Sequence, residues 1–239
     1  MSQPASTVRA RYGLIVPSSN RMAEPHAACF NPDGVVAHTA RLRMTGPHVM
    51  GLDELLPKVA AAAEMLADAT CGSIIFHCTA NSMASGLAGE KRIAGAIEKA
   101  TGLTAATTAS ATMAAFEALN AKRVVLVSPY PRESHEHEIE FLEEAGCEIV
   151  GERNLGLAGS EAYSAMQPSE WVETLKGMKN DKANVYFASC ANIRAIEALE
   201  EMEEMLDAPV VTSNQLVIWQ ALRLAGINDP IPGLGRLAA

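Results

Sequence analysis

The sequence predicts an α/β fold of two pseudo-symmetric lobes, each a mainly parallel sheet flanked by helices. Three observations predict it. Short β-branched runs alternate with stretches of helical pattern along all 239 residues. Several of these runs are apolar on consecutive residues, which is typical of strands buried on both faces of a parallel sheet. Polar segments that follow strands in the first half of the chain recur, in the same order, in the second half.

Eight strands are expected in chain order, at residues 12–16, 35–42, 73–77, 103–107, 123–127, 147–150, 184–188 and 209–212. Runs such as GSIIF, RVVLV and NVYFA show no polar alternation, so both faces of these strands are expected to be buried. The segments between the strands carry apolar residues at helical spacing, as at Ile193, Ile196 and Leu199. The glutamates of residues 200–204 are expected on a solvated face of that helical segment.

The internal repeat consists of three pairs of strand ends. VPSSN at residues 16–20 matches VSPYP at 127–131, FHCTAN at 76–81 matches FASCAN at 187–192, and TTASA at 107–111 matches VTSNQ at 211–215. Because the members of each pair are separated by 104 to 112 residues, we interpret residues 1–118 and 119–239 as two pseudo-equivalent lobes. Ligands of parallel sheets bind outside the carboxyl ends of the strands, which predicts an active site in the interlobe cleft.

Composition limits the classes of protein and partner. With 49% hydrophobic and 20% charged residues, the chain is able to bury a large core and is not disordered. A net charge of −9 disfavours nucleic acid and anionic membranes as partners. Five cysteines without a CxxC pair indicate neither a disulfide framework nor a zinc module, and the sequence shows no signal peptide or membrane-spanning segment. A cytoplasmic location is therefore expected.

Cys78 and Cys190 are the most informative residues. Each follows an apolar strand, where free backbone N–H groups and a following helix would stabilise a thiolate. The same N–H groups, together with Thr79, Asn81 and Asn192, would hold a carboxylate or a developing enolate. The other three cysteines lack this context and are interpreted as small buried hydrophobic residues.

Two further strand ends carry polar side chains. Ser18, Ser19 and Asn20 follow the first strand, and they fit either a helix N-cap or the binding of a carboxylate without a cationic side chain. Tyr130 stands at the matching place in the second half, either as a half-buried aromatic residue or as a phenol that donates into the cleft.

Other motifs give weaker signals. The HEHEIE segment at residues 135–140 looks like a metal site, but His135 and His137 would point about 200° apart on a helix, so a solvated helix is expected instead. The single GxG at residues 233–235 lacks the strand and helix of a dinucleotide site, and the sequence contains no Walker loop, HExxH or GxSxG motif. No metal and no cofactor are therefore expected.

Paired cysteine strand ends in two pseudo-symmetric lobes resemble the aspartate/glutamate racemase superfamily. Within it, the segments VPSSN, SPY, ASCANIRA, VTSNQLVIWQALRLAG and GLGRL are similar to the maleate cis–trans isomerase and arylmalonate decarboxylase branch, and the similarity runs from about residue 12 to residue 237. This resemblance implies a cofactor-independent enzyme that acts at a carbon beside a carboxylate. It also implies a small carboxylate or dicarboxylate substrate and a homodimer.

Two details bear on the reaction that the resemblance implies. Decarboxylases of this branch generally keep only the second cysteine, so the presence of both Cys78 and Cys190 favours an isomerase or a racemase. Maleate isomerases have aliphatic residues after the first cysteine and an asparagine in the LAGSEAY segment, where this chain has Thr79, Ala80 and Ser160. We expect a maleate isomerase in which Cys78 is the nucleophile and Cys190 handles protons.

The resemblance also implies a set of substrate-binding residues: Ser19, Asn20, Thr79, Tyr130, Ser160, Ala191, Asn192, Ser213 and Asn214. Two alternatives stay open. The first is an arylmalonate decarboxylase-like enzyme or a racemase, in which the cysteines only move protons. The second belongs to another class and is a non-catalytic module that binds carboxylates.

Overall fold

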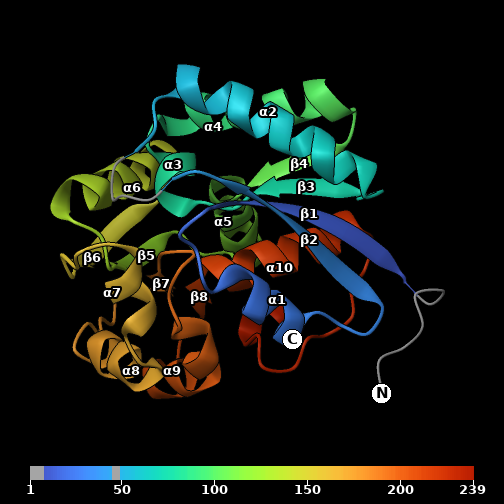
Figure 1. The fold of residues 1–239 in the computed structure, drawn as a ribbon. Helices are drawn as coiled ribbons and strands as arrows, with labels where there is room; N and C mark the ends of the chain where they lie inside the picture. The colour runs from blue at the N-terminus through green and yellow to red at the C-terminus, as the bar shows by residue number, and fades with distance from the viewer. Residues whose placement is uncertain (1–7, 45–48) are drawn as a thin grey trace.

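Within residues 8–44 and 49–239, which the computed structural model describes, the strands form two parallel sheets of four strands each (Figure 1). The first contains β1 (Ala10–Pro17), β2 (Val35–Leu42), β3 (Ser73–Phe76) and β4 (Thr104–Thr107) in the order β2-β1-β3-β4. The second contains β5 (Arg123–Ser128), β6 (Glu148–Asn154), β7 (Val185–Ala188) and β8 (Val210–Thr212) in the order β6-β5-β7-β8. The two sheets have the same topology, so the predicted two-lobed α/β fold is confirmed.

Burial explains why these runs are strands. Leu14, Ile15 and Val16 lie consecutively in β1 and are almost completely inaccessible, as expected for a central strand covered on both faces. β6 differs from the expected segment, because it continues to Asn154 as a more exposed strand at the edge of its sheet. The apolar pattern of β6 ends before its backbone pairing with β5 does.

Helices connect the strands. They are α1 (Ala23–Phe30), α2 (Leu52–Asp68), α3 (Thr79–Met83), α4 (Gly86–Thr101), α5 (Thr108–Ala118), α6 (Arg132–Glu144), α7 (Ser160–Ala165), α8 (Pro168–Lys176), α9 (Leu199–Leu206) and α10 (Ser213–Leu224), with the short 3-10 helices η2 (Ala195–Ala198) and η3 (Arg236–Ala238). In each half the last strand runs directly into a helix with a capping box, formed by Thr107 and Ser110 before α5 and by Thr212 and Gln215 before α10. These matching caps are a structural counterpart of the sequence repeat.

The two halves share a core. α2 and α4 cover one face of the first sheet, and α1 and α10 lie on its other side (Figure 1). Although α10 is the last α-helix, it packs against α1, β3 and α5 of the first half. One cluster of buried side chains accordingly includes Phe116 of α5, Phe187 of β7 and Leu222 of α10, with the two phenylalanine rings edge to face at 6.1 Å. The lobe boundary that we propose, at residues 118 and 119, falls between α5 and β5.

Two acidic helices are more buried than the sequence analysis predicted. His135 and Glu138 of α6 are completely buried, so the prediction of a simple solvated helix for HEHEIE was wrong. In α9, Glu203 is buried because its carboxylate accepts hydrogen bonds from the backbone N–H groups of Val210 and Arg236. In both helices one residue of an acidic run shares the helix face of buried apolar neighbours.

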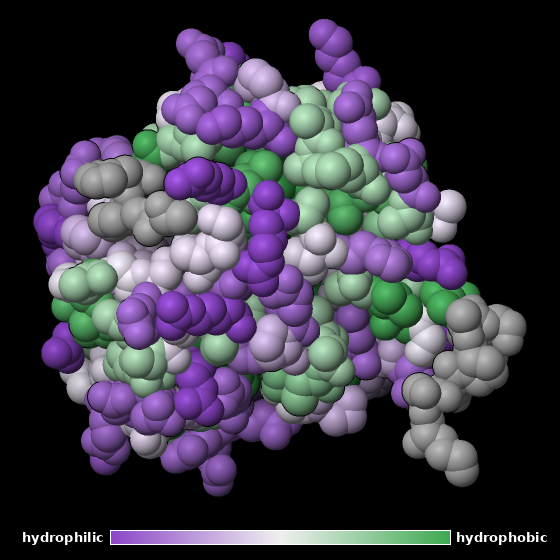
Figure 2. Space-filling model, in the orientation of Figure 1, coloured by the Kyte–Doolittle hydropathy of each residue, from purple (hydrophilic) through white to green (hydrophobic). Residues whose placement is uncertain are grey.

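Hydrophobic side chains on the face shown in Figure 2 lie in small groups between hydrophilic ones, so this face alone does not mark an interface. Across the two described ranges, no helix combines the length and the apolar character that crossing a membrane requires.

Candidate active site

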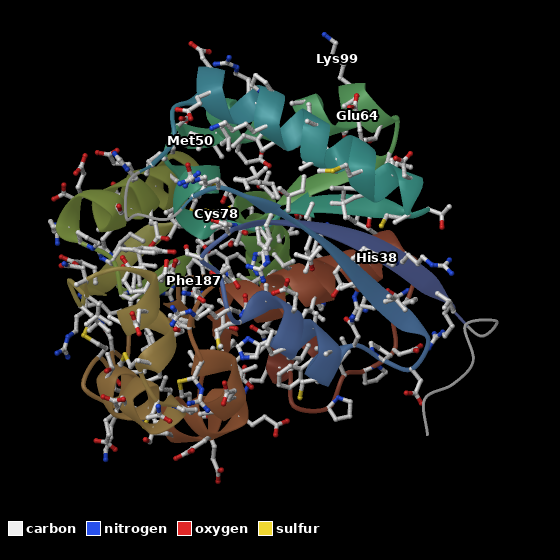
Figure 3. The ribbon with its side chains drawn as sticks, viewed as in Figure 1. His38, Met50, Glu64, Cys78, Lys99 and Phe187 are labelled. Carbon is white, nitrogen blue, oxygen red and sulfur yellow. The ribbon has the colours of Figure 1, made fainter. Side chains whose placement is uncertain are left out.

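One pocket collects most of the predicted site residues. It lies where strand ends of both halves meet, and its volume, open mouth included, is about 550 Å³. Figure 3 shows Cys78 near the centre of the molecule, at the start of α3. The predicted residues that line the pocket are Ser19, Asn20, Cys78, Thr79, Asn81, Tyr130, Ser160, Cys190, Ala191 and Asn192. Ser213 and Asn214 do not belong to the lining.

Cys78 is the N-cap residue of α3 and is buried. Asn81 donates from its Nδ2 to the Cys78 Sγ at 3.4 Å, and its Oδ1 accepts the Met50 backbone N–H at 2.8 Å. Because Met50 holds the amide oxygen, the amide NH₂ group faces the sulfur. Burial raises the pKa of the Cys78 thiol, and hydrogen bonds from Asn81 oppose this effect. The thiol is therefore the resting form, beside donors that would stabilise a thiolate.

Cys190 lies in a turn. The helix expected directly after it starts only at Ala195, as η2, because Cys190 adopts a φ of 151°, which L residues rarely adopt and which no helix continues. Its backbone N–H donates to the Ser213 Oγ at 3.0 Å, and the Asn192 N–H donates to its Sγ at 3.2 Å. Burial raises its pKa to about 12, against hydrogen bonds from Tyr130 and Asn192. The sulfur is held in a fixed place and is protonated at neutral pH.

Hydrogen bonds between the two halves fix the pocket walls. The Asn20 Nδ2 donates to the Ala191 carbonyl at 2.7 Å, and the Arg21 backbone N–H donates to the Asn192 Oδ1 at 2.7 Å. The Asn20 Oδ1 accepts two further backbone N–H groups just before and at the start of α1. An amide nitrogen carries two hydrogens, so Asn20 is able to bind a ligand while it keeps its contact with Ala191.

Ser160 extends this interlobe contact from α7. Its Oγ donates to the Ser19 Oγ at 2.8 Å, and its backbone carbonyl accepts from the Asn192 Nδ2 at 2.8 Å. Ser19 in turn donates to the Met44 carbonyl at 3.0 Å. One wall of the pocket is therefore a chain of hydroxyl and amide groups that joins both halves.

Ser213 supports the pocket from behind. The Thr79 Oγ1 donates to the Ser213 Oγ at 2.8 Å, and the same oxygen accepts the backbone N–H of Cys190. Ser213 therefore connects the two cysteine loops. It holds these loops from outside the lining instead of facing the pocket itself.

Asn214 has a similar place in a buried polar chain. Its Oδ1 lies 2.7 Å from the His77 Nε2, and its Nδ2 lies 2.6 Å from the His26 Nδ1. The His77 Nδ1 lies 3.0 Å from the Thr108 hydroxyl. Burial lowers the pKa of His77 to about 4, so this imidazole is neutral at pH 7. His77 is committed to these contacts and not to the thiol of the next residue.

Two tyrosines form another wall. The rings of Tyr130 and Tyr163 meet edge to face, with centroids 5.6 Å apart and planes at 80°. Burial raises the pKa of Tyr130 well above its ordinary value and that of Tyr163 to about 12, so both remain phenols. The Tyr163 hydroxyl has no hydrogen-bond partner among the described residues. The sequence analysis missed Tyr163, although its place one helical turn after Ser160 was a usable signal.

The other lining residues that the sequence analysis did not single out for ligand binding are Pro17, Met44 and Ala80. The described lining contains no lysine and no arginine, so an anionic ligand would be held by N–H and O–H dipoles. In the part of the chain that the structure describes, no three His, Cys, Asp or Glu side chains are grouped so that they could hold a metal ion.

A model of the arylmalonate decarboxylase family matches residues 12–238. The chain belongs to this family. An arylmalonate decarboxylase of Bordetella bronchiseptica is 29% identical over 94% of this chain and 95% of its own length. A maleate isomerase of Nocardia farcinica is 27% identical over 95% of this chain and 94% of its own length.

Solved structures of both kinds have the same fold. A mutant of Nocardia farcinica maleate cis–trans isomerase with a covalently bound succinylcysteine intermediate gives a TM-score of 0.88 at 22% identity, over 96% of this chain and 98% of that chain. A glycine-to-cysteine mutant of arylmalonate decarboxylase, in a sulfate-associated form, gives a TM-score of 0.85 at 28% identity, over 95% of this chain and 99% of that chain. The predicted branch is confirmed, and the chain is an enzyme of the arylmalonate decarboxylase family. Relatives with two different activities match 94 to 95% of its length, so likeness alone does not choose the reaction.

Proposed function

We propose that this enzyme is a cofactor-independent maleate cis–trans isomerase in which Cys78 is the nucleophile and Cys190 handles protons. The observation that carries this proposal is that two thiols, one from each half of the chain, line a single pocket whose other polar lining residues are uncharged. Maleate isomerases of Nocardia farcinica and Pseudomonas putida, which are 27% and 25% identical to this chain, support it.

In the proposed reaction the Cys78 thiolate adds to one alkene carbon of maleate. A carbon–sulfur bond forms, and the electron pair of the alkene moves to the other carbon and spreads into its carboxylate. The carbon–carbon bond is now single and rotates, and expulsion of the thiolate restores the double bond as fumarate. Cys190 serves the intermediate as acid and base, giving a proton to the carbanionic carbon and taking it back before elimination. Atoms and electrons balance, because maleate and fumarate are isomers.

The substrate carboxylates would be held by uncharged groups from both halves. Asn20 and Ser160 lie on the interlobe wall, and Tyr130 and Tyr163 lie on the aromatic wall. The Tyr163 hydroxyl, which has no hydrogen-bond partner among the described residues, would donate to a carboxylate that enters the pocket. Dipoles that are fixed in advance stabilise a developing enolate without further reorganisation.

A decarboxylase or racemase is the second candidate, because the matching family model and the Bordetella relative both carry the decarboxylase name. In that reaction a thiol moves a proton at the carbon beside a carboxylate, and no carbon–sulfur bond forms.

One experiment separates these reactions. The purified enzyme is incubated in deuterated buffer with maleate, with an arylmalonate, and with chiral amino and hydroxy acids, and each mixture is followed by NMR. Loss of maleate with growth of fumarate is expected. Loss of one arylmalonate carboxyl group would identify a decarboxylase, and deuterium exchange at an α-carbon alone would identify a racemase. Binding without any turnover would indicate a carboxylate-binding module.

A trapping experiment tests the covalent step. Cys190→Ser keeps the proposed nucleophile but removes the proton-handling thiol, so an adduct at Cys78 should accumulate with maleate. Peptide mass spectrometry after an acid quench should find the added mass on Cys78. Turnover of maleate with no adduct under any quench condition would contradict covalent addition.

A further inference from the structure

Glu138 is a buried acid that the proposed mechanism does not use. It lies on α6 and is completely inaccessible. Its Oε1 accepts a hydrogen bond from the Ser189 hydroxyl at 2.6 Å, and Ser189 directly precedes Cys190. Its Oε2 has no hydrogen-bond partner among the described residues. An unpaired oxygen in a dry site is far more costly for a carboxylate than for a neutral carboxylic acid.

This carboxyl group stands behind both cysteines. α6 packs against α3, which begins at Cys78, and the Ser189 hydrogen bond joins α6 to the Cys190 turn. A negative charge on Glu138 raises the pKa of Cys78, of Cys190 and of Tyr130, so its charge acts on all three pocket groups.

Other charged groups near α6 do not neutralise Glu138. Burial raises the pKa of Glu138 to about 8, and the Ser189 hydrogen bond opposes this rise. Several titratable and charged side chains on α6 and on the elements packed against it pair with other groups: His135 with Ser128 and Glu152, Arg132 with Glu136 and Glu152, Glu90 with Thr107, and Glu144 with the backbone of Leu87. No ion pair to Glu138 is found among the described residues, which include the remaining titratable side chains of the same helix, Glu133, His137, Glu140 and Glu143.

We propose that Glu138 is a positioning residue that holds the Ser189–Cys190 turn, and that its uncharged form allows the two thiols to ionise. Above the pH at which Glu138 loses its proton, its negative charge opposes thiolate formation at both cysteines. The inference rests on the proposed function, since Glu138 acts only through the thiols assigned there. The pocket lining has no cationic side chain to stabilise a thiolate, and an uncharged Glu138 adds no negative charge that would oppose thiolate formation.

The test measures how fast iodoacetamide alkylates Cys78 and Cys190 as pH is varied, with peptide mass spectrometry as the readout. Glu138→Gln keeps the side-chain shape and an oxygen for Ser189, but it carries no charge. At pH 6.5 Glu138 is protonated, so the parent and Glu138→Gln should react at equal rates. At pH 9 the variant should react about 3- to 10-fold faster, since a tenfold change corresponds to one pKa unit.

A matched control is Glu90→Gln. Glu90 is also a buried acid and accepts a hydrogen bond from a threonine hydroxyl, at 2.8 Å, but it does not line the pocket. Its variant should follow the parent at every pH. A fold that is merely loosened would expose the thiols at pH 6.5 as well as at pH 9, so the pH dependence of the rate ratio separates the two explanations.

Equal rates of the parent and Glu138→Gln at pH 9 would overturn the proposal, as would the same acceleration in Glu90→Gln. Ser189→Ala gives an independent test, because losing the hydrogen bond raises the pKa of Glu138 further. The alkylation rates of the Ser189→Ala protein should then fall below those of Glu138→Gln only at a higher pH than in the parent. A pH profile identical to that of the parent would count against the proposal. No substrate is present, so this outcome is independent of whether maleate is turned over.

Discussion

Glu138→Gln should make the stability of the folded enzyme much less sensitive to alkaline pH. Burial moves the pKa of Glu138 from an ordinary 4.5 to about 8. Between these values the unfolded chain has released the proton while the folded chain retains it, so the free energy of unfolding falls as pH rises. Each unit of the shift corresponds to about 1.4 kcal/mol, which sets an upper figure of about 5 kcal/mol for the complete loss.

Urea unfolding of the parent and of Glu138→Gln, at several pH values from 5 to 9, measures this effect. At pH 5 the two proteins should have similar free energies of unfolding, since a protonated glutamate and a glutamine have similar shape and both accept from Ser189. By pH 9 the variant should be more stable by roughly 3 to 5 kcal/mol, with an unchanged denaturant slope. Contributions from titrating groups that Glu138 does not influence are common to both proteins and cancel in the difference.

A stability difference that stays constant from pH 5 to pH 9 would refute this reasoning, because it would mean that Glu138 ionises in the folded protein near its ordinary pKa. Glu90→Gln, at another buried acid that accepts a hydrogen bond from a hydroxyl group, provides the comparison.

Four other predictions follow from the fold and the site. Cys78→Ser should lower maleate turnover about 10³-fold or more and Cys190→Ser about 10²- to 10⁴-fold, whereas Cys147→Ser should stay within about a few-fold in the same NMR assay. Tyr163→Phe should lower kcat/KM about tenfold if its hydroxyl binds a substrate carboxylate, and unchanged kinetics would remove it from the site. Acidification from pH 6.5 to 4 should lower the free energy of unfolding by up to about 3 kcal/mol, because buried His77 takes up its proton only near pH 4 while the unfolded chain does so near 6.5. In urea titrations, a His77→Gln variant should lack this pH dependence. Light scattering should give the mass of a homodimer, and the mass of one chain at micromolar concentration would contradict that assembly.

The strands and the equivalence of the two halves were predictable because the signal is local, whereas the order of the strands was not predicted. Runs such as SIIF and VYFA are buried on every residue, and the three repeated strand ends gave the equivalence of the halves before any pairing was known. Ten of the predicted site residues line one pocket, because most of them follow strands and the carboxyl ends of parallel strands meet at one edge of a sheet.

The remaining features depend on contacts distant in sequence. The turn at Cys190 is held by Ser213, and the burial of Glu138 depends on Ser189; neither contact leaves a pattern in the local sequence. A hydrophobicity count treats every glutamate of α6 as solvated. The spacing of Ser134, Glu138 and Phe141, all on the buried face, would have been the only sequence clue to its position.

The electrostatic balance of the pocket follows from the residue that precedes each cysteine. His77 and Ser189 occupy equivalent places in the two halves, before Cys78 and Cys190. Burial lowers the pKa of His77 to about 4, and it raises the pKa of Glu138, the partner of Ser189, to about 8. Near pH 7 both groups are therefore mostly uncharged, and the described lining adds no lysine or arginine. A substrate dianion then meets only fixed N–H and O–H dipoles, which are most effective in a dry site where no full charge competes with them. Below the lower of these two pKa values His77 gains a positive charge, and above the higher one Glu138 gains a negative charge. These two buried groups behind the pocket are therefore both uncharged only around the pH at which the thiol chemistry is proposed to occur.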